Sequence, residues 1–263
     1  MEEMSKNYLK RANAVIDEAK KELEVSDLDD EERSKYYPHI GLAERNVEMA
    51  KVFLDQNYLY SAANYSFNAR VLAGTVEEIA KTPSLLNNES KVLDLKIKNL
   101  RREIKILKKD MFYIPLVEVE WLIGAQQRIA YAENALNTLE ADTNTELSEE
   151  DLFNRVYDYV SASGWFEATK DFFEEAEKSK SKKIVYYSDK FILEISERLI
   201  EVEEIINSSS VSDEALSESN RRLGAAKISF DNNFYFAALF DTYFAEGFIV
   251  AEQDKEQISD EEL

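Results

Sequence analysis

Residues that could do acid–base or metal chemistry are few in this chain of 263 residues, which has one histidine and no cysteine. The histidine, His39, follows Tyr36-Tyr37-Pro38, and the sequence fixes no acid or nucleophile beside it. A single histidine excludes zinc sites of the HExxH type and paired ExxH di-iron sites, and the absence of cysteine excludes thiol catalysis and thiolate ligands. We interpret His39 as a partly exposed residue at the start of a helix.

Two acidic runs, 27–31 and 142–146, alternate in the way that calcium ligands do. Calcium loops of the EF-hand type need glycine at the sixth position and glutamate at the twelfth, and neither run has these residues. The glycine-rich phosphate loops and the G-x-S-x-G serine motif are also absent. We expect no metal site, no cofactor and no enzymatic activity from this chain alone.

Segment 91–109 could instead bind anions, because it has eight basic and two acidic residues, a net charge of 8 − 2 = +6. Two interpretations stay open: a docking strip for an anionic peptide or subunit, or a solvated face that pairs with acidic helices of the same chain. The whole chain has a net charge of −21, which opposes binding to nucleic acid and to anionic membranes. The candidate partner-binding residues in this segment are Arg101, Arg102, Lys105 and Lys108.

Aromatic residues gather in two stretches, 58–67 and 230–244. Rings at helical spacing are usually core residues, but the second stretch holds more of them than one buried stripe accommodates. An excess of surface aromatic residues is a feature of binding faces. The candidate partner-binding residues here are Tyr58, Tyr60, Phe234 and Phe236.

Long helices must position these side chains, because the chain has only six glycines and three prolines and its apolar residues recur at helical spacing. No segment shows the two-residue alternation of strands. The sequence predicts an all-α fold of about nine helices in antiparallel hairpins, with TPR-like or solenoid-like packing and no sheet. The expected helices are 4–25, 38–56, 58–82, 84–112, 115–140, one that opens at Ser148, and then 182–206, 212–231 and 233–253.

An internal repeat aligns residues 43–72 with 219–248 without a gap. Each copy is predicted to be a helical hairpin that turns at Asp-x-Asn, and Asn57 and Asn233 suit the left-handed position that closes a first helix. Common origin and convergent turn chemistry both remain open. We expect a helical-hairpin domain over 1–207, followed by a second hairpin over 208–263 that packs on the same domain and ends in an acidic, frayed tail at 254–263.

The hairpin signature also carries a family resemblance. Its elements are Ala43-Glu44, Ala50-Lys51, Asn57-Tyr58, Ser61-Ala62-Ala63, and Phe67-Asn68-Ala69. This tract, followed by a basic helix and further hairpins, resembles the C-terminal helical region of archaeal Lon-like (S16-type) serine proteases. Such peptidases use a Ser–Lys dyad in an α/β domain, and no position here matches the motif of its serine. The resemblance therefore implies a noncatalytic part that holds substrate, organises subunits or spaces the catalytic domain from a membrane anchor.

The leading prediction is a noncatalytic interaction or substrate-recruiting module of such a protease. The alternatives are a free-standing TPR-like scaffold or adaptor and, third, a small-molecule-binding helical bundle. The expected partner is a protein or peptide, with self-association into a homo-oligomer also open; we expect no nucleic acid and no direct membrane insertion by this chain. A complete chain would be cytoplasmic, whereas a fragment of a Lon-like protease would be membrane-anchored or extracytoplasmic.

Overall fold

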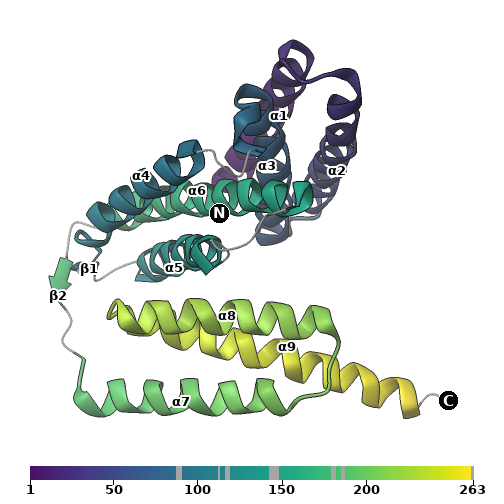
Figure 1. The fold of residues 1–263 in the computed structure, drawn as a ribbon. Helices are drawn as coiled ribbons and strands as arrows, with labels where there is room; N and C mark the ends of the chain where they lie inside the picture. The colour runs from purple at the N-terminus through teal and green to yellow at the C-terminus, as the bar shows by residue number, and fades with distance from the viewer. Residues whose placement is uncertain are drawn as a thin grey trace. The chain divides into compact units, whose positions relative to one another are not determined.

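The computed structural model describes residues 1–86, 91–111, 113–115, 119–141, 148–178, 182–184 and 187–261. Within these ranges the fold is all-α, as expected, with nine α-helices and one 3-10 turn (Figure 1). The helices are α1 (Glu2–Val25), α2 (Asp30–Asp55), α3 (Leu59–Lys81), α4 (Lys91–Lys108), α5 (Val119–Ala141), α6 (Glu149–Glu177), α7 (Asp189–Ser208), α8 (Asp213–Asp231) and α9 (Tyr235–Glu261); the 3-10 turn is Pro83–Leu86.

The chain divides into two compact units, which we describe separately. The first comprises residues 1–100 and 138–164, and in it α1, α2 and α3 pack on one another. The second comprises residues 101–137 and 165–263, and in it α7, α8 and α9 pack on one another. The serine-rich stretch 208–210 lies inside the second unit. Each unit therefore contains a group of three consecutive helices.

The second helix begins earlier than the sequence indicated. We expected its start near Pro38, but α2 starts at Asp30 and Pro38 lies inside it. The reason is a capping box: the Asp29 side chain accepts a hydrogen bond of 2.9 Å from the Glu32 amide, and the Glu32 carboxylate accepts one of 3.2 Å from the Asp29 amide. The acidic residues Asp30, Glu31 and Glu32 thus form the first turn of a helix, where negative charge is favourable.

The repeat has the same backbone geometry in both copies. Asn57 and Asn233 both have φ of 62°, the left-handed conformation predicted for them. The amide of the next residue donates a hydrogen bond to the carbonyl five residues before it in each copy. Tyr58 donates to Phe53 and Phe234 donates to Ser229, and both hydrogen bonds are 2.8 Å long. Each turn therefore joins two helices, α2 to α3 and α8 to α9, which we call the first and second helix pair.

Other helix ends also follow local sequence. Ser148 and Asp151 bond to each other's amides at the start of α6, and Ser212 caps α8, so both helices start close to the expected positions. Apolar residues recur along α4 at steps of four and three. Leu93, Ile97, Leu100 and Ile104 each expose less than a tenth of their surface, as does Met111 just beyond the helix, whereas Leu107 is half-buried.

A short ladder departs from the expectation of no sheet. Strand β1 (Tyr113–Pro115) pairs antiparallel with β2 (Lys182–Ile184), in the register Tyr113 with Ile184. Consequently α7 begins at Asp189, capped by Ser188, and not at Lys182. At the other end of the chain α9 continues to Glu261, past the expected end at Gln253.

Among the residues that the structure describes, no helix is long and apolar enough to cross a membrane.

Candidate functional site

An exposed aromatic patch lies where α2 turns into α3. It consists of Phe53, Tyr58, Tyr60 and Tyr65, and we call it the turn-end patch. The Phe53 ring stacks on Tyr65 at 5.2 Å between centroids and meets Tyr58 edge-on at 6.2 Å. Tyr58 and Tyr60 expose 60% and 62% of their surface. Both residues, which were predicted to bind a partner, therefore lie at the turn of the first helix pair.

The equivalent rings of the second helix pair are covered. Phe234, which corresponds to Tyr58, is 1% exposed and belongs to the core. Phe236, which corresponds to Tyr60, is half-buried and lies 5.5 Å from the Tyr187 ring and 5.7 Å from the Phe191 ring at the start of α7. The prediction of Phe234 as a surface binding residue is therefore wrong, because this copy of the turn is packed within the protein. The repeat alone could not distinguish a covered copy from an exposed one.

The basic residues of α4 divide into two sets. Lys108 pairs with Glu133 at 2.7 Å, and Arg101 donates to the Leu136 carbonyl at 3.0 Å and the Asn137 amide oxygen at 3.2 Å. Lys96 pairs with Glu78 at 2.8 Å. These contacts agree with the interpretation of self-pairing within the chain. Arg102 and Lys105 are exposed, and no ion pair of the described residues includes them.

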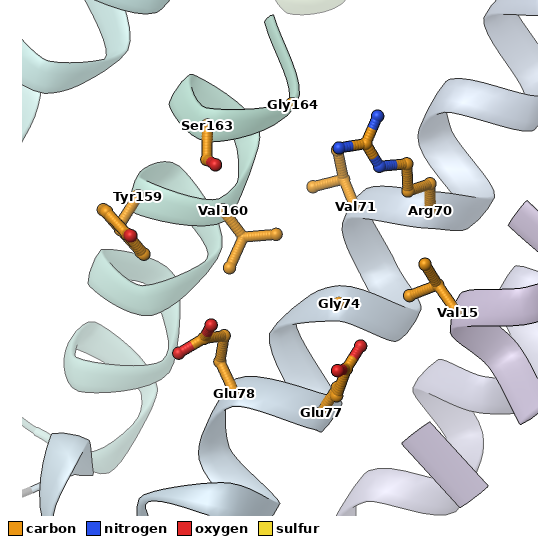
Figure 2. A pocket seen from close by; sticks show the side chains of 10 residues that line it. All are labelled: Val15, Arg70, Val71, Gly74, Glu77, Glu78, Tyr159, Val160, Ser163 and Gly164. Carbon is orange, nitrogen blue, oxygen red and sulfur yellow. The ribbon is translucent and has the colours of Figure 1, made fainter. Parts of the chain in front are cut away.

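A small open pocket of about 160 Å³ lies in the first unit between α3 and α6, with Val15 of α1 at its edge (Figure 2). Two glycines allow this close approach: a Cβ on Gly74 would lie 3.1 Å from Val160, and one on Gly164 would lie 3.1 Å from Phe67. Its acids Glu77 and Glu78 already pair with Lys81 and Lys96. We interpret this pocket as a gap of helix packing, since ligand sites usually have several hundred Å³ and unpaired polar groups.

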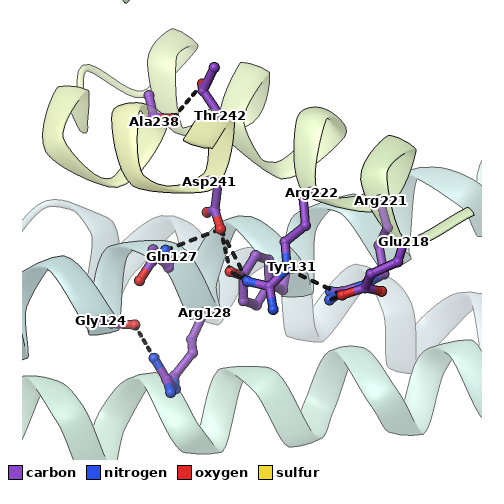
Figure 3. A network of polar contacts seen from close by, with 10 residues as sticks. All are labelled: Gly124, Gln127, Arg128, Tyr131, Glu218, Arg221, Arg222, Ala238, Asp241 and Thr242. Carbon is purple, nitrogen blue, oxygen red and sulfur yellow. Dashed lines mark hydrogen bonds and ion pairs between the residues drawn. The ribbon is translucent and has the colours of Figure 1, made fainter. Parts of the chain in front are cut away.

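A buried polar network in the second unit was not anticipated from the sequence (Figure 3). Tyr131 of α5 donates a hydrogen bond of 2.5 Å to the Asp241 carboxylate of α9. Arg222 of α8 contacts both groups, lying 3.2 Å from Asp241, and Gln127 donates to the same carboxylate oxygen at 3.1 Å. Asp241 is fully buried. Gln127 and Tyr131 lie one turn apart on α5, whereas Arg222 and Asp241 come from α8 and α9, so only the fold brings the network together.

Burial governs the proton equilibria of this network. It raises the pKa of Asp241, although Tyr131 and Arg222 act in the opposite direction. It also raises the pKa of the Tyr131 hydroxyl, which therefore remains a hydrogen-bond donor. The second carboxylate oxygen of Asp241 is buried and has no hydrogen-bond partner. The network joins α5 to α8 and α9, and a buried hydrogen-bonded network of this kind orients the helices that it connects.

His39 lies inside α2 and not at a helix start as expected, and its ring stacks on Phe153 at 4.5 Å. Burial lowers the pKa of the imidazole. No group of three histidine, aspartate or glutamate side chains in the described ranges is arranged to hold a metal ion. The acidic run 142–146 lies outside the described residues.

Comparison with known proteins adds no relative: no protein-family model, curated protein or solved structure matches the chain.

Proposed function

We propose that this chain is a noncatalytic module that binds a protein or peptide through the turn-end patch. The observation that carries the proposal is the contrast between two copies of one turn. Tyr58 and Tyr60 are mostly exposed, whereas the corresponding Phe234 is buried and Phe236 is half-buried. The first copy retains large rings that do not stabilise the core.

Such rings are suited to binding. Tyrosine supplies a large contact area with few rotatable bonds and a hydroxyl that can donate a hydrogen bond, and it is enriched among the residues that dominate binding energy. The rings lie at a tight turn between two packed helices, so their backbone is held in place before binding. A site that is already ordered loses less conformational entropy on association. We further propose that, within each unit, the helix pair and its neighbouring helix pack in a TPR-like manner.

A more specific proposal follows from the sequence resemblance. The tract at 57–69 and the basic helix α4 occur in the order found in the C-terminal region of archaeal Lon-like proteases. On this proposal the module recruits substrates or organises subunits for a peptidase domain. The free-standing scaffold is the alternative, and both use the same patch. The third alternative, a small-molecule-binding bundle, is the least supported because the described pocket is small.

Selection of peptides tests the binding proposal. Random linear peptides displayed on phage would be selected on the whole chain and measured against the Tyr58→Ser/Tyr60→Ser variant by fluorescence anisotropy. We expect the selected peptides to lose about tenfold or more in affinity, which corresponds to one or two lost aromatic contacts.

The matched control changes two exposed apolar residues of α7, Leu193→Ser and Ile200→Ser. This control should bind the peptides as the unchanged protein does. Failure to select any peptide, or equal binding by the tyrosine variant, would overturn the proposal.

A further inference from the structure

The outward side of α2 carries an apolar stripe. Leu42, Met49 and Val52 are spaced by seven and three residues, which places them on one face of the helix. They expose 43%, 40% and 46% of their surface. A different face of α2, with Ile40, Ala43, Val47 and Ala50, is buried. We call Leu42, Met49 and Val52 the α2 outer stripe.

The repeat identifies the corresponding stripe of α8, because residue numbers in the two copies differ by 233 − 57 = 176. Met49 corresponds to Ala225 and Val52 to Ile228. In the second unit this side of α8 is covered by a helix: Ala225 packs in a cluster with Ala130 and Tyr131 of α5. The α2 outer stripe is therefore exposed, whereas the corresponding face of α8 is covered by a helix.

Contacts along α8 show how closely that helix fits. Asn232 donates a hydrogen bond of 2.8 Å to Glu133 of α5, and Ile228 packs against the cluster of Ala130 and Tyr131. A Cβ on Gly224 would lie 3.0 Å from the Asn134 side chain, so α8 and α5 approach closely there. At its opposite face α8 packs Leu223 and Ala226 into the core with α7 and α9. Thus α8 uses two faces for packing.

We propose that the α2 outer stripe binds an amphipathic α-helix of a partner protein, placed on α2 and α3 as α5 is placed on α8 and α9. The inference rests on the proposed function and names the class of its partner. We infer a helical partner and not an extended peptide because the equivalent face of α8 already binds a helix, α5.

The differences between the copies define the chemistry of that helix. Leu42 stands in place of Glu218, Asn46 in place of Arg222, and Tyr65 in place of Asp241. The buried ionic network therefore has no counterpart, and the partner helix must present an apolar face. Met49 is larger than Ala225, so a small residue is expected opposite it.

Acidic residues beside the α2 outer stripe favour basic residues next to the apolar face of the partner helix. Glu48 and Asp55 are exposed on α2, and the ion pairs of the described residues include neither. The whole chain carries a net charge of −21, which attracts basic partners at long range. We therefore expect lysine or arginine beside the apolar face of the partner helix.

A designed peptide tests this inference with the whole chain. Its sequence is that of residues 119–137, with Gln127→Leu and Tyr131→Leu to remove the groups that contact the ionic network, and Glu133→Lys to add a basic flank. We expect binding by fluorescence anisotropy together with a gain of helical signal in circular dichroism. The Met49→Glu/Val52→Glu variant should bind about tenfold or more weakly.

Two matched proteins control for folding and specificity. The Leu193→Glu/Ile200→Glu variant introduces the same charges on exposed positions of α7 and should bind normally. The milder Met49→Ser/Val52→Ser variant should keep the melting temperature of the unchanged chain and still bind more weakly.

Equal binding by the Met49 and Val52 variants, or no binding to the unchanged chain, would overturn the helix-docking inference. The proposed function would then still be decided by the Tyr58→Ser/Tyr60→Ser measurement. Sedimentation velocity gives a third outcome. If the unchanged chain dimerises and Met49→Glu/Val52→Glu makes it monomeric, a second copy occupies the stripe and the inference is wrong.

Discussion

Asn57 and Asn233 adopt the same left-handed backbone conformation at equivalent points of two helix turns, with φ of 62° in each. They differ in one contact: the Tyr235 hydroxyl donates a hydrogen bond of 2.8 Å to the Asn233 side chain, whereas the residue equivalent to Tyr235 is Leu59. The two turns thus share a backbone requirement but not a side-chain role.

Substitution of Asn57 and Asn233 should separate the effect of the left-handed backbone conformation from that of the Tyr235 hydrogen bond. Alanine should lower the free energy of unfolding by about 1 kcal/mol at Asn57, because alanine lacks the short polar side chain with which asparagine tolerates the left-handed region. At Asn233 the loss should be about 2 kcal/mol, because the Tyr235 hydrogen bond is lost as well. Asn57→Gly should be nearly neutral, since glycine adopts this conformation readily. Asn233→Gly should lose about 1 kcal/mol with the Tyr235 hydrogen bond. Urea denaturation measures all four values. Equal effects of glycine at the two positions would contradict the assigned role of Tyr235.

The buried network of Tyr131, Arg222 and Asp241 should respond unequally to removal of its members. Arg222→Leu should lower the free energy of unfolding by about 3 kcal/mol, because it leaves a buried carboxylate without its cation. Tyr131→Phe should lower the free energy of unfolding by about 1.5–3 kcal/mol, the value of a hydrogen bond to a charged group. Denaturant unfolding followed by circular dichroism measures both losses.

The double variant Arg222→Leu/Asp241→Leu is the informative comparison for this network. Replacing both partners removes the buried charge, so the double variant should be more stable than Arg222→Leu alone. Arg102→Leu, at an exposed arginine, is the control and should change stability by less than about 0.5 kcal/mol. The single variant Asp241→Leu completes the cycle. A loss in the double variant equal to the sum of the Arg222→Leu and Asp241→Leu losses would show that the two groups do not act together.

Replacement of two helical glycines by alanine should change stability in opposite directions. A Cβ on Gly124 would lie 2.6 Å from the Phe172 ring. The Arg128 guanidinium carbon lies 3.5 Å from the centroid of the same ring. Gly124→Ala should therefore lower stability by about 1–3 kcal/mol through overpacking. Gly41 has no atom within 4 Å of the same position, so Gly41→Ala should raise stability by up to about 1 kcal/mol. Thermal unfolding of both variants checks the signs; stabilisation by Gly124→Ala would show that Phe172 moves freely.

His39, as the single histidine, allows a clean titration by proton NMR. Burial against Phe153 lowers its pKa below the ordinary value of 6.5, and Phe153→Ala should bring the midpoint back toward that value. Between the lowered pKa and 6.5 the unfolded chain binds more protons than the folded protein. The contribution of His39 to stability is therefore complete above pH 6.5 and is lost as the pH falls through the folded pKa.

His39→Gln should accordingly reduce the loss of stability on acidification in this window. A midpoint at or above 6.5 in the unchanged chain would contradict the burial of the imidazole that the structure indicates.

Local sequence patterns predicted much of the fold. The scarcity of glycine and proline predicted the all-α class, and the conformation of Asn57 and Asn233 followed from turn chemistry alone. The start of α2 was missed because a proline was interpreted as a helix boundary, whereas the Asp29 cap determines it. Proline in a helix removes one hydrogen bond, and packing of the helix can outweigh that loss.

The candidate site was less accessible to sequence reasoning. The equivalence of Tyr58 and Phe234 was visible, but their opposite burial depends on contacts formed by other helices. The network of Tyr131, Arg222 and Asp241 joins three helices, and no spacing rule connects residues that far apart. The pairing of Lys108 with Glu133, by contrast, followed one of the two interpretations of the basic segment.

The unequal covering of the two turns also bears on how the sequence can change over generations. A substitution at Phe234 disturbs the core, so selection for folding restricts that position. A substitution at Tyr58 leaves the core intact, because the ring already faces solvent. Position 58 is therefore free to change together with whatever the protein binds, while position 234 must follow the needs of the fold.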